Sequence, residues 1–122
     1  MSGNEKEEVL SCYKGSHADS NLEMVRRTLA EDPDNDLLKD WLALNLYQAE
    51  RFAEAAILYE ELLTKAKGTP DQHYYLGNCH FALGKLEAAC RQWQEVIEMD
   101  PSSKTAQKVI RKLQTLSDKE AA

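Results

Sequence analysis

The chain lacks the short motifs that carry the common enzyme chemistries. It contains no glycine-rich phosphate loop, no dinucleotide-binding glycine pattern, no G-x-S-x-G and no H-E-x-x-H. Adjacent acidic residues such as Glu60 and Glu61 are expected on solvated helix faces rather than in acid–base catalysis. These absences predict that the protein is not an enzyme, has no catalytic residues and needs no cofactor.

Cysteine is also scarce. The three cysteines, Cys12, Cys79 and Cys90, cannot all pair within the chain and show no C-x-x-C spacing, so we expect reduced thiols. Cys79 and Cys90 fall where small apolar residues belong, and we expect both to pack in the interior. On a helix, His73 and His80 would share a face whereas Cys79 would point elsewhere, and zinc needs several converging ligands. We therefore predict no metal site and place both histidines on the helix surface or in a groove.

Long apolar runs are missing as well. No segment approaches the ~20 apolar residues that a membrane span requires, and the first residues are polar and acidic, unlike a secretory signal. The formal net charge of −6 argues against a nucleic-acid partner, because phosphate contacts need a basic surface. We expect a cytoplasmic protein with no direct membrane insertion.

The chain does contain a regular spacing of 34 residues. Pro33 and Pro101 are 68 residues apart, which is twice 34. Asn35, Thr69 and Ser103 recur at the single interval, and their short polar side chains are of the kind that caps a helix N-terminus. After Thr69, a proline at the first helical position and a glutamine three residues after the cap predict a capping box. The spacing predicts helices that begin near 36, 70 and 104.

The segment 73–101 carries the most specific pattern. Large and small residues alternate through it at helical spacings and a proline closes it, in the order Leu76, Gly77, Phe81, Gly84, Ala89, Trp93 and Pro101. This pattern resembles the tetratricopeptide repeat, a helix–turn–helix unit of 34 residues. The resemblance implies an all-α fold, a short α-solenoid of antiparallel helix pairs, in which each unit stacks on its neighbours.

The predicted layout is a single domain over 1–122 with about seven helices. It comprises a degenerate N-terminal repeat at 1–35, a repeat at 36–69, the best-matching repeat at 70–103, and a capping helix and tail at 104–122. Within the first repeat we expect a short helix from Glu5 to Tyr13, a loop from Gly15 to Ser20 and a helix over Leu22–Leu29. The last helix has an apolar stripe formed by Ala106, Val109, Ile110, Leu113 and Leu116, which would seal the end of the stack.

The resemblance also implies where a partner would bind. In the repeat family the first helices line a concave groove, and here these are roughly 36–49 and 70–83. The candidate groove residues are Asp40, Trp41, Leu44, Tyr47, Tyr74, Asn78 and Phe81, with a basic contribution that Lys108 and Lys112 could make. We expect Tyr74 and Asn78 to be exposed there and Tyr47 and Phe81 to pack in part. For Trp41, packing and groove remain equally open.

The functional prediction is a protein–protein interaction module, that is, an adaptor, scaffold or chaperone. It would bind a peptide or helix of a protein partner in the groove. One alternative is a structural subunit that forms a homo-oligomer or joins a larger complex through its edges. Another is a co-chaperone with a degenerate carboxylate clamp, because Asn78 matches one clamp asparagine whereas Tyr74 and Asp40 replace clamp lysines. Mitochondrial fission adaptors and bacterial secretion chaperones are similar in layout or size, and the residues do not select between them.

Overall fold

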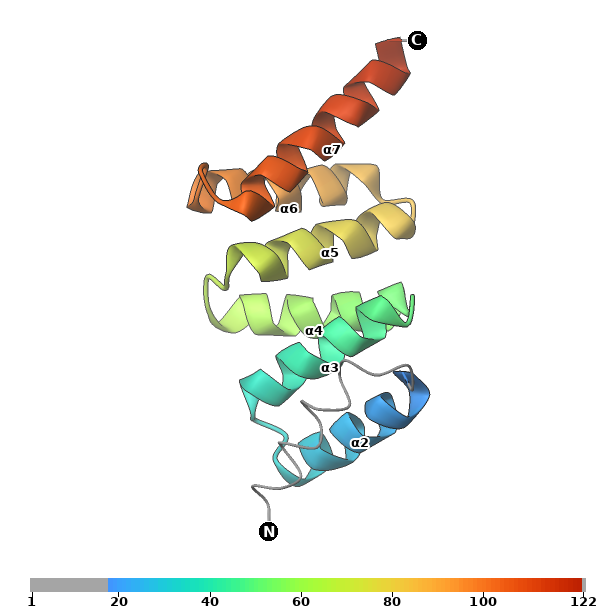
Figure 1. The fold of residues 1–122 in the computed structure, drawn as a ribbon. Coiled ribbons are helices and arrows are strands. Elements are labelled where there is room, and N and C mark those ends of the chain that lie inside the picture. The colour runs from blue at the N-terminus through green and yellow to red at the C-terminus, as the bar shows by residue number, and fades with distance from the viewer. Residues whose placement is uncertain (1–17, 122) are drawn as a thin grey trace. The chain divides into compact units, whose positions relative to one another are not determined.

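The computed structural model describes residues 18–121 (Figure 1). Every element in that range is a helix: α2 (Ala18–Glu31), α3 (Asp36–Gln48), α4 (Phe52–Lys65), α5 (Pro70–Ala82), α6 (Leu86–Met99) and α7 (Lys104–Ala121). The predicted all-α class is confirmed. The predicted helix from Glu5 to Tyr13 lies outside the described residues. The chain divides into two compact units, Met1–Leu62 and Leu63–Ala122.

The three predicted caps are confirmed. The Asn35 side chain accepts a hydrogen bond from the Leu38 backbone N–H at 3.1 Å, and Ser103 Oγ accepts one from the Ala106 N–H at 3.0 Å. Thr69 accepts one from the Gln72 N–H, and the Gln72 side chain accepts from the Thr69 N–H, which completes the capping box. Each cap satisfies a backbone donor that has no partner in the first turn of a helix. The 34-residue spacing is therefore the spacing of helix starts.

In the first unit, α2 packs against α3, and consecutive helices run in opposite directions (Figure 1). The buried side chains include Leu22 and Val25 of α2, Leu38, Leu42 and Leu46 of α3, and Ala55 and Tyr59 of α4. Arg26 of α2 donates to Glu54 of α4 at 2.6 Å. The expected loop over Gly15–Ser20 is wrong from Ala18 onward, because α2 already begins at that residue.

The turns between paired helices use the left-handed backbone region. Gly84, between α5 and α6, has φ 79°, and Glu50, at the equivalent place between α3 and α4, has φ 61°. Glycine adopts this conformation without steric cost, whereas a residue with a Cβ does not. The two units thus share one turn geometry with different residues at its critical position.

In the second unit, α5 and α6 form an antiparallel hairpin and α7 packs against both (Figure 1). The bounds of α5 agree with the predicted first helix of the best-matching repeat. None of the described helices combines the length and the apolar character that a membrane crossing demands.

Candidate functional site

A close approach between α5 and α6 organises the second unit. At Gly77 of α5, a Cβ would lie 2.5 Å from both Cδ1 and Nε1 of Trp93 on α6, so only a residue without a side chain fits there. The Trp93 indole N–H donates to Asn78 Oδ1 at 3.2 Å. The pair Gly77-Asn78 therefore supplies both the space for the indole and the acceptor for its buried N–H.

Trp93 is the centre of an apolar cluster that α7 covers. Trp93 is 1% exposed, and the other buried members of this cluster are Ala89, Val96, Ala106 and Val109. Leu113, Leu116 and Tyr74 pack against it in part. The expected packing of the apolar stripe of the last helix is confirmed for Ala106, Val109, Leu113 and Leu116, but Ile110 is 43% exposed.

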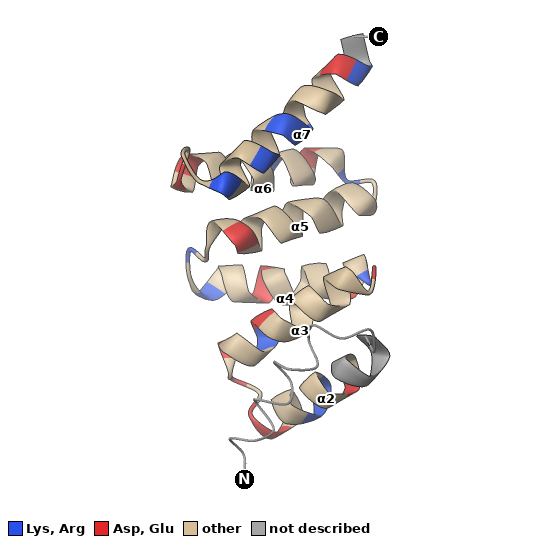
Figure 2. Ribbon diagram, in the orientation of Figure 1, with Lys and Arg blue, Asp and Glu red and all other residues tan. Residues whose placement is uncertain are grey.

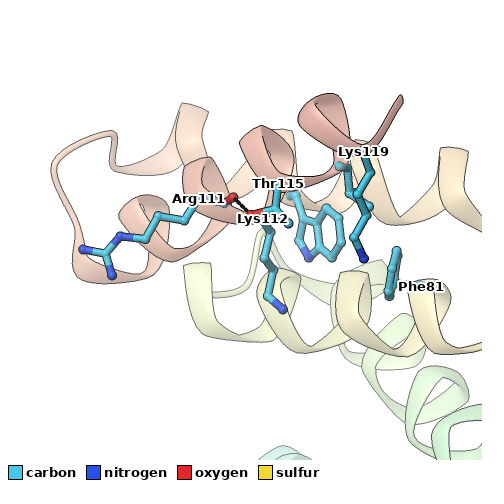
Figure 3. A pocket seen from close by; sticks show the side chains of 7 residues that line it. Phe81, Arg111, Lys112, Thr115 and Lys119 are labelled. Carbon is cyan, nitrogen blue, oxygen red and sulfur yellow. Dashed lines mark hydrogen bonds between the residues drawn. The ribbon is translucent and has the colours of Figure 1, made fainter. Parts of the chain in front are cut away.

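A pocket of about 320 Å³ opens beside this cluster in the second unit (Figure 3). Its lining residues come from all three helices of the unit: Phe81, Trp93, Arg111, Lys112, Thr115, Leu116 and Lys119. We call this the α5–α7 pocket. Phe81 is 47% exposed. Its ring centre lies 5.7 Å from that of Trp93, and the two ring planes are tilted by 38°. The pocket therefore has an aromatic wall that solvent reaches.

The other wall of the pocket is basic. Figure 3 shows Lys112 and Lys119 extending from α7 toward α5, with the tip of Lys119 beside Phe81, whereas the Arg111 guanidinium points away from them. Lys112 Nζ lies 5.9 Å from the ring centres of both Tyr74 and Trp93, and Lys108 Nζ lies at the same distance from Tyr74. Such distances are within the range of cation–π attraction. Two of the basic residues that colour α7 blue in Figure 2, Lys108 and Lys112, thus lie over aromatic faces.

The sequence predicted part of this site and missed part of it. Phe81 and Lys112 line the pocket as candidate residues, and Tyr74 and Lys108 are adjacent through the cation–π contacts. The missed lining residues are Trp93, Arg111, Thr115, Leu116 and Lys119. The α7 members of this set are spaced so that they share one helix face, and that spacing was a usable signal. The same spacing also fits a helix that only caps the stack, so it does not by itself predict a pocket.

The expected exposure of Asn78 is wrong. Its side chain is 9% exposed and accepts the Trp93 indole hydrogen bond, because a buried N–H requires a partner. Tyr74 is half-buried rather than open, since it packs against the Trp93 cluster. The partial packing expected of Phe81 is confirmed by its contact with Trp93.

The remaining candidate groove residues lie on α3 in the first unit. Asp40, Trp41, Leu44 and Tyr47 are all half-buried, and Tyr47 meets Phe52 edge-on with ring centres 5.7 Å apart. The partial packing expected of Tyr47 is confirmed. That these residues form one groove with those of the second unit stays a prediction.

The two histidines are more buried than expected. His73 is 9% exposed and His80 is 7% exposed, so of the two expected places, helix surface or groove, the helix surface is wrong. His73 Nε2 donates to the Lys67 carbonyl at 2.9 Å, and its Nδ1 lies 2.7 Å from Gln92 Oε1. The ring thereby joins the loop before α5 to α6. Among residues 18–121, no group of three or more His, Cys, Asp or Glu is placed to hold a metal ion.

The cysteines of the second unit have the packing role that was expected. Cys79 is fully buried and Cys90 half-buried, and both are free thiols. Burial raises the pKa of Cys79 to about 12, because desolvation disfavours the thiolate. Cys79 therefore stays protonated and unreactive near neutral pH. Cys12 lies outside the described residues.

Comparisons with known proteins agree with this architecture. A family model for the tetratricopeptide repeat matches residues 42–104. A solved structure of the first TPR of Spaghetti (RPAP3) bound to HSP90 peptide SRMEEVD has a TM-score of 0.82 at 21% identity, covering 99% of this chain and 94% of that one. The first TPR domain of human RPAP3 gives 0.79 at 25% identity, with 100% and 97% covered. The second TPR domain of human RPAP3, in complex with HSP70 peptide SGPTIEEVD, gives 0.77 at 22%, with 90% and 92% covered. A search of curated protein sequences finds no match.

Proposed function

The chain belongs to the tetratricopeptide-repeat family, and from that premise we propose that it is an interaction module that binds a segment of a partner protein. We assign the binding site to the α5–α7 pocket of the second unit. The carrying observation is Phe81, which is 47% exposed at the wall of a pocket of about 320 Å³. A large aromatic side chain exposed beside an apolar hollow is typical of surfaces that bind another protein.

Two further observations support the proposal. Ligand clefts usually measure roughly 300 to 1,000 Å³, and this pocket of about 320 Å³ is at the lower end. It therefore accommodates one or two side chains of a peptide rather than a whole helix face. Two of the similar structures hold peptides, one from HSP90 and one from HSP70. Both peptides occupy domains with the same arrangement of helices.

The carboxylate-clamp alternative concerns the same unit. Of the clamp-like residues, Lys108 and Lys112 lie over the Tyr74 ring, and Asn78 accepts from Trp93. A clamp requires a free C-terminal carboxylate on the peptide, whereas the α5–α7 pocket requires only a side chain. Peptides with free and with blocked C-termini therefore separate the two sites.

A displayed library of random peptides tests the proposal. We expect wild-type protein to select peptides that Phe81→Ser no longer binds, because serine removes the exposed wall of the pocket. Leu86→Ser is the matched control, since Leu86 is 43% exposed in the same unit but does not line the pocket. Circular dichroism melting of each variant establishes that it remains folded.

Three results would count against the proposal. Peptides that bind wild type and Phe81→Ser equally would move the site elsewhere. Loss of binding in Leu86→Ser but not in Phe81→Ser would place it at the α5–α6 turn. No selected peptide, together with a mass that rises with protein concentration in sedimentation equilibrium, would favour the alternative of a self-assembling structural subunit.

A further inference from the structure

The cations of the α5–α7 pocket have no acidic partners among the described side chains. The lining residues include Arg111, Lys112 and Lys119 but no Asp or Glu. In the first unit, by contrast, Glu54 pairs with two arginines, Arg26 and Arg51. This local excess of positive charge occurs in a chain whose formal net charge is −6.

The apolar part of the pocket lies directly beside these cations. Lys112 Nζ is 5.9 Å from the Trp93 ring centre, and Lys119 extends toward Phe81 (Figure 3). Leu116 lies between these two lysines in the sequence, is half-buried, and belongs to the same lining. A ligand that fills this space must therefore cover apolar surface and meet positive charge within a few ångströms.

We infer that the occupant of the α5–α7 pocket is an acidic protein segment with one bulky apolar side chain between its carboxylates. The apolar side chain contacts Phe81 and Leu116, and the carboxylates pair with Lys112 and Lys119. The inference rests on the proposed function and adds the chemistry of the partner. Side-chain carboxylates are assigned to both lysines, so the segment needs no free C-terminus.

Charge complementarity favours an acidic protein segment over a nucleic acid. A phosphate backbone needs a basic surface that continues along many phosphates, whereas the unpaired cations here surround one apolar hollow. The remainder of the chain is acidic and would repel a longer polyanion. A single apolar anchor with flanking carboxylates matches the apolar wall and the two lysines beside it.

The first test is isothermal titration calorimetry with short synthetic peptides blocked at both ends. The probe carries one leucine between runs of Asp and Glu. One control peptide has serine in place of the leucine, and a second has Asn and Gln in place of the acids. We expect each control to bind more weakly, the serine peptide by at least about tenfold and the amide peptide by about threefold to thirtyfold.

Protein variants locate the effect. We expect Lys112→Gln/Lys119→Gln to weaken the acidic probe by about threefold to thirtyfold while binding the amide peptide like wild type. Lys104→Gln is the matched control, because Lys104 is exposed on α7 but does not line the pocket. Thr115→Glu adds a carboxylate within the lining. It should weaken the binding of the acidic probe severalfold more than the neutral Thr115→Gln does.

The outcomes separate this inference from the proposed function. If the amide peptide binds as tightly as the acidic one and Phe81→Ser still abolishes both, the acidic partner is wrong and the interaction site stands. If Phe81→Ser changes the binding of neither peptide, the site itself is wrong. If an oligothymidine of equal charge displaces the acidic probe as well as the probe displaces itself, the pocket is a general polyanion site and the inference fails.

Discussion

The contact between Gly77, Asn78 and Trp93 combines steric and polar requirements in one place. Adding a Cβ at Gly77 would bring it to 2.5 Å from the indole. Removing the Asn78 amide would leave the indole N–H buried without its acceptor, although Trp93 itself would still fit. The two substitutions therefore destabilise by different mechanisms, which makes them separate tests of the same packing.

We predict that Gly77→Ala lowers the free energy of unfolding by about 1–3 kcal/mol, the usual range for overpacking, and that Gly77→Leu lowers it further. We predict about 1–3 kcal/mol for Asn78→Ala, the cost of an unsatisfied buried donor. Urea unfolding followed by circular dichroism measures both. Gln94→Ala, at an exposed position of α6, is the control and should change little. A fully stable Gly77→Leu variant would contradict the observed helix pairing.

The turn residues Glu50 and Gly84 form a second matched pair. Glu50 has φ 61° and Gly84 has φ 79°, and a Cβ at Gly84 would meet no atom within 4 Å. A side chain at position 84 would therefore cost only the backbone strain of the left-handed conformation, a strain that Glu50 already has. We predict that Gly84→Ala destabilises by about 1 kcal/mol and that Glu50→Gly is stabilising by up to about 1 kcal/mol. Thermal melting measures both, and equal signs for the two changes would refute a shared turn geometry.

The Cys79 thiol is a third residue with a predictable response. Its pKa of about 12 in the folded protein lies above the ordinary thiol pKa of 9.0, so folding disfavours the thiolate. Below about pH 9 the thiol is neutral in both the folded and the unfolded chain, so it does not make stability depend on pH. Above that pH the unfolded chain loses the proton first, which favours unfolding. Stability is then lost as pH rises through about 9 toward 12. We expect iodoacetamide to modify Cys79 at pH 8 only at the rate of unfolding, as mass spectrometry of digested samples would show. Rapid modification of native protein would contradict its burial.

At the scale of helices, the sequence was sufficient where the signals are local. Thr69, Pro70 and Gln72 act within one turn, so the capping box and the start of α5 could be predicted. The loop expected before Leu22 failed because polar residues such as Asp19 and Ser20 suit a helix start as well as a loop. Local composition does not distinguish those two cases.

The site was less accessible from sequence because its contacts are not local. Phe81 and Lys119 are brought to one pocket only by the way α7 crosses α5. The burial of Asn78 depends on Trp93, 15 residues away on the next helix. A helical pattern indicates which residues share a face, but it does not indicate how far the neighbouring helix covers that face.

The orientation of α7 can be tested with two adjacent residues. Val109 is fully buried against the Trp93 cluster, whereas Ile110 is 43% exposed. We predict that Val109→Ala lowers the free energy of unfolding by about 2 kcal/mol, from two lost methyl groups and the cavity that remains. Ile110→Ala should cost less than half of that. Urea unfolding decides between them, and a reversed order would mean that α7 presents another face to α6.

For the whole molecule, dissolved salt has opposite effects on folding and on the binding of an acidic peptide. The chain carries a formal net charge of −6, so dissolved salt screens its self-repulsion, whereas the same salt screens the attraction between α7 and an acidic peptide. Raising NaCl from about 0.1 to 1 M shortens the Debye length from about 10 to 3 Å. We predict that this change weakens the binding of the acidic probe severalfold without lowering the melting temperature of the protein. Calorimetric titration and thermal melting on one sample series measure both, and salt-independent affinity would argue against ion pairing.

The distribution of the two tryptophans provides the protein with an optical reporter. Trp41 lies in the first unit and Trp93 forms part of the α5–α7 pocket in the second. Replacing Trp41 by phenylalanine would leave one indole, in contact with Phe81 and Lys112. Its fluorescence depends on how much water and charge surround the ring. A ligand that enters the pocket would thus alter the emission of Trp93 directly, and occupancy could be followed in real time without attaching any dye.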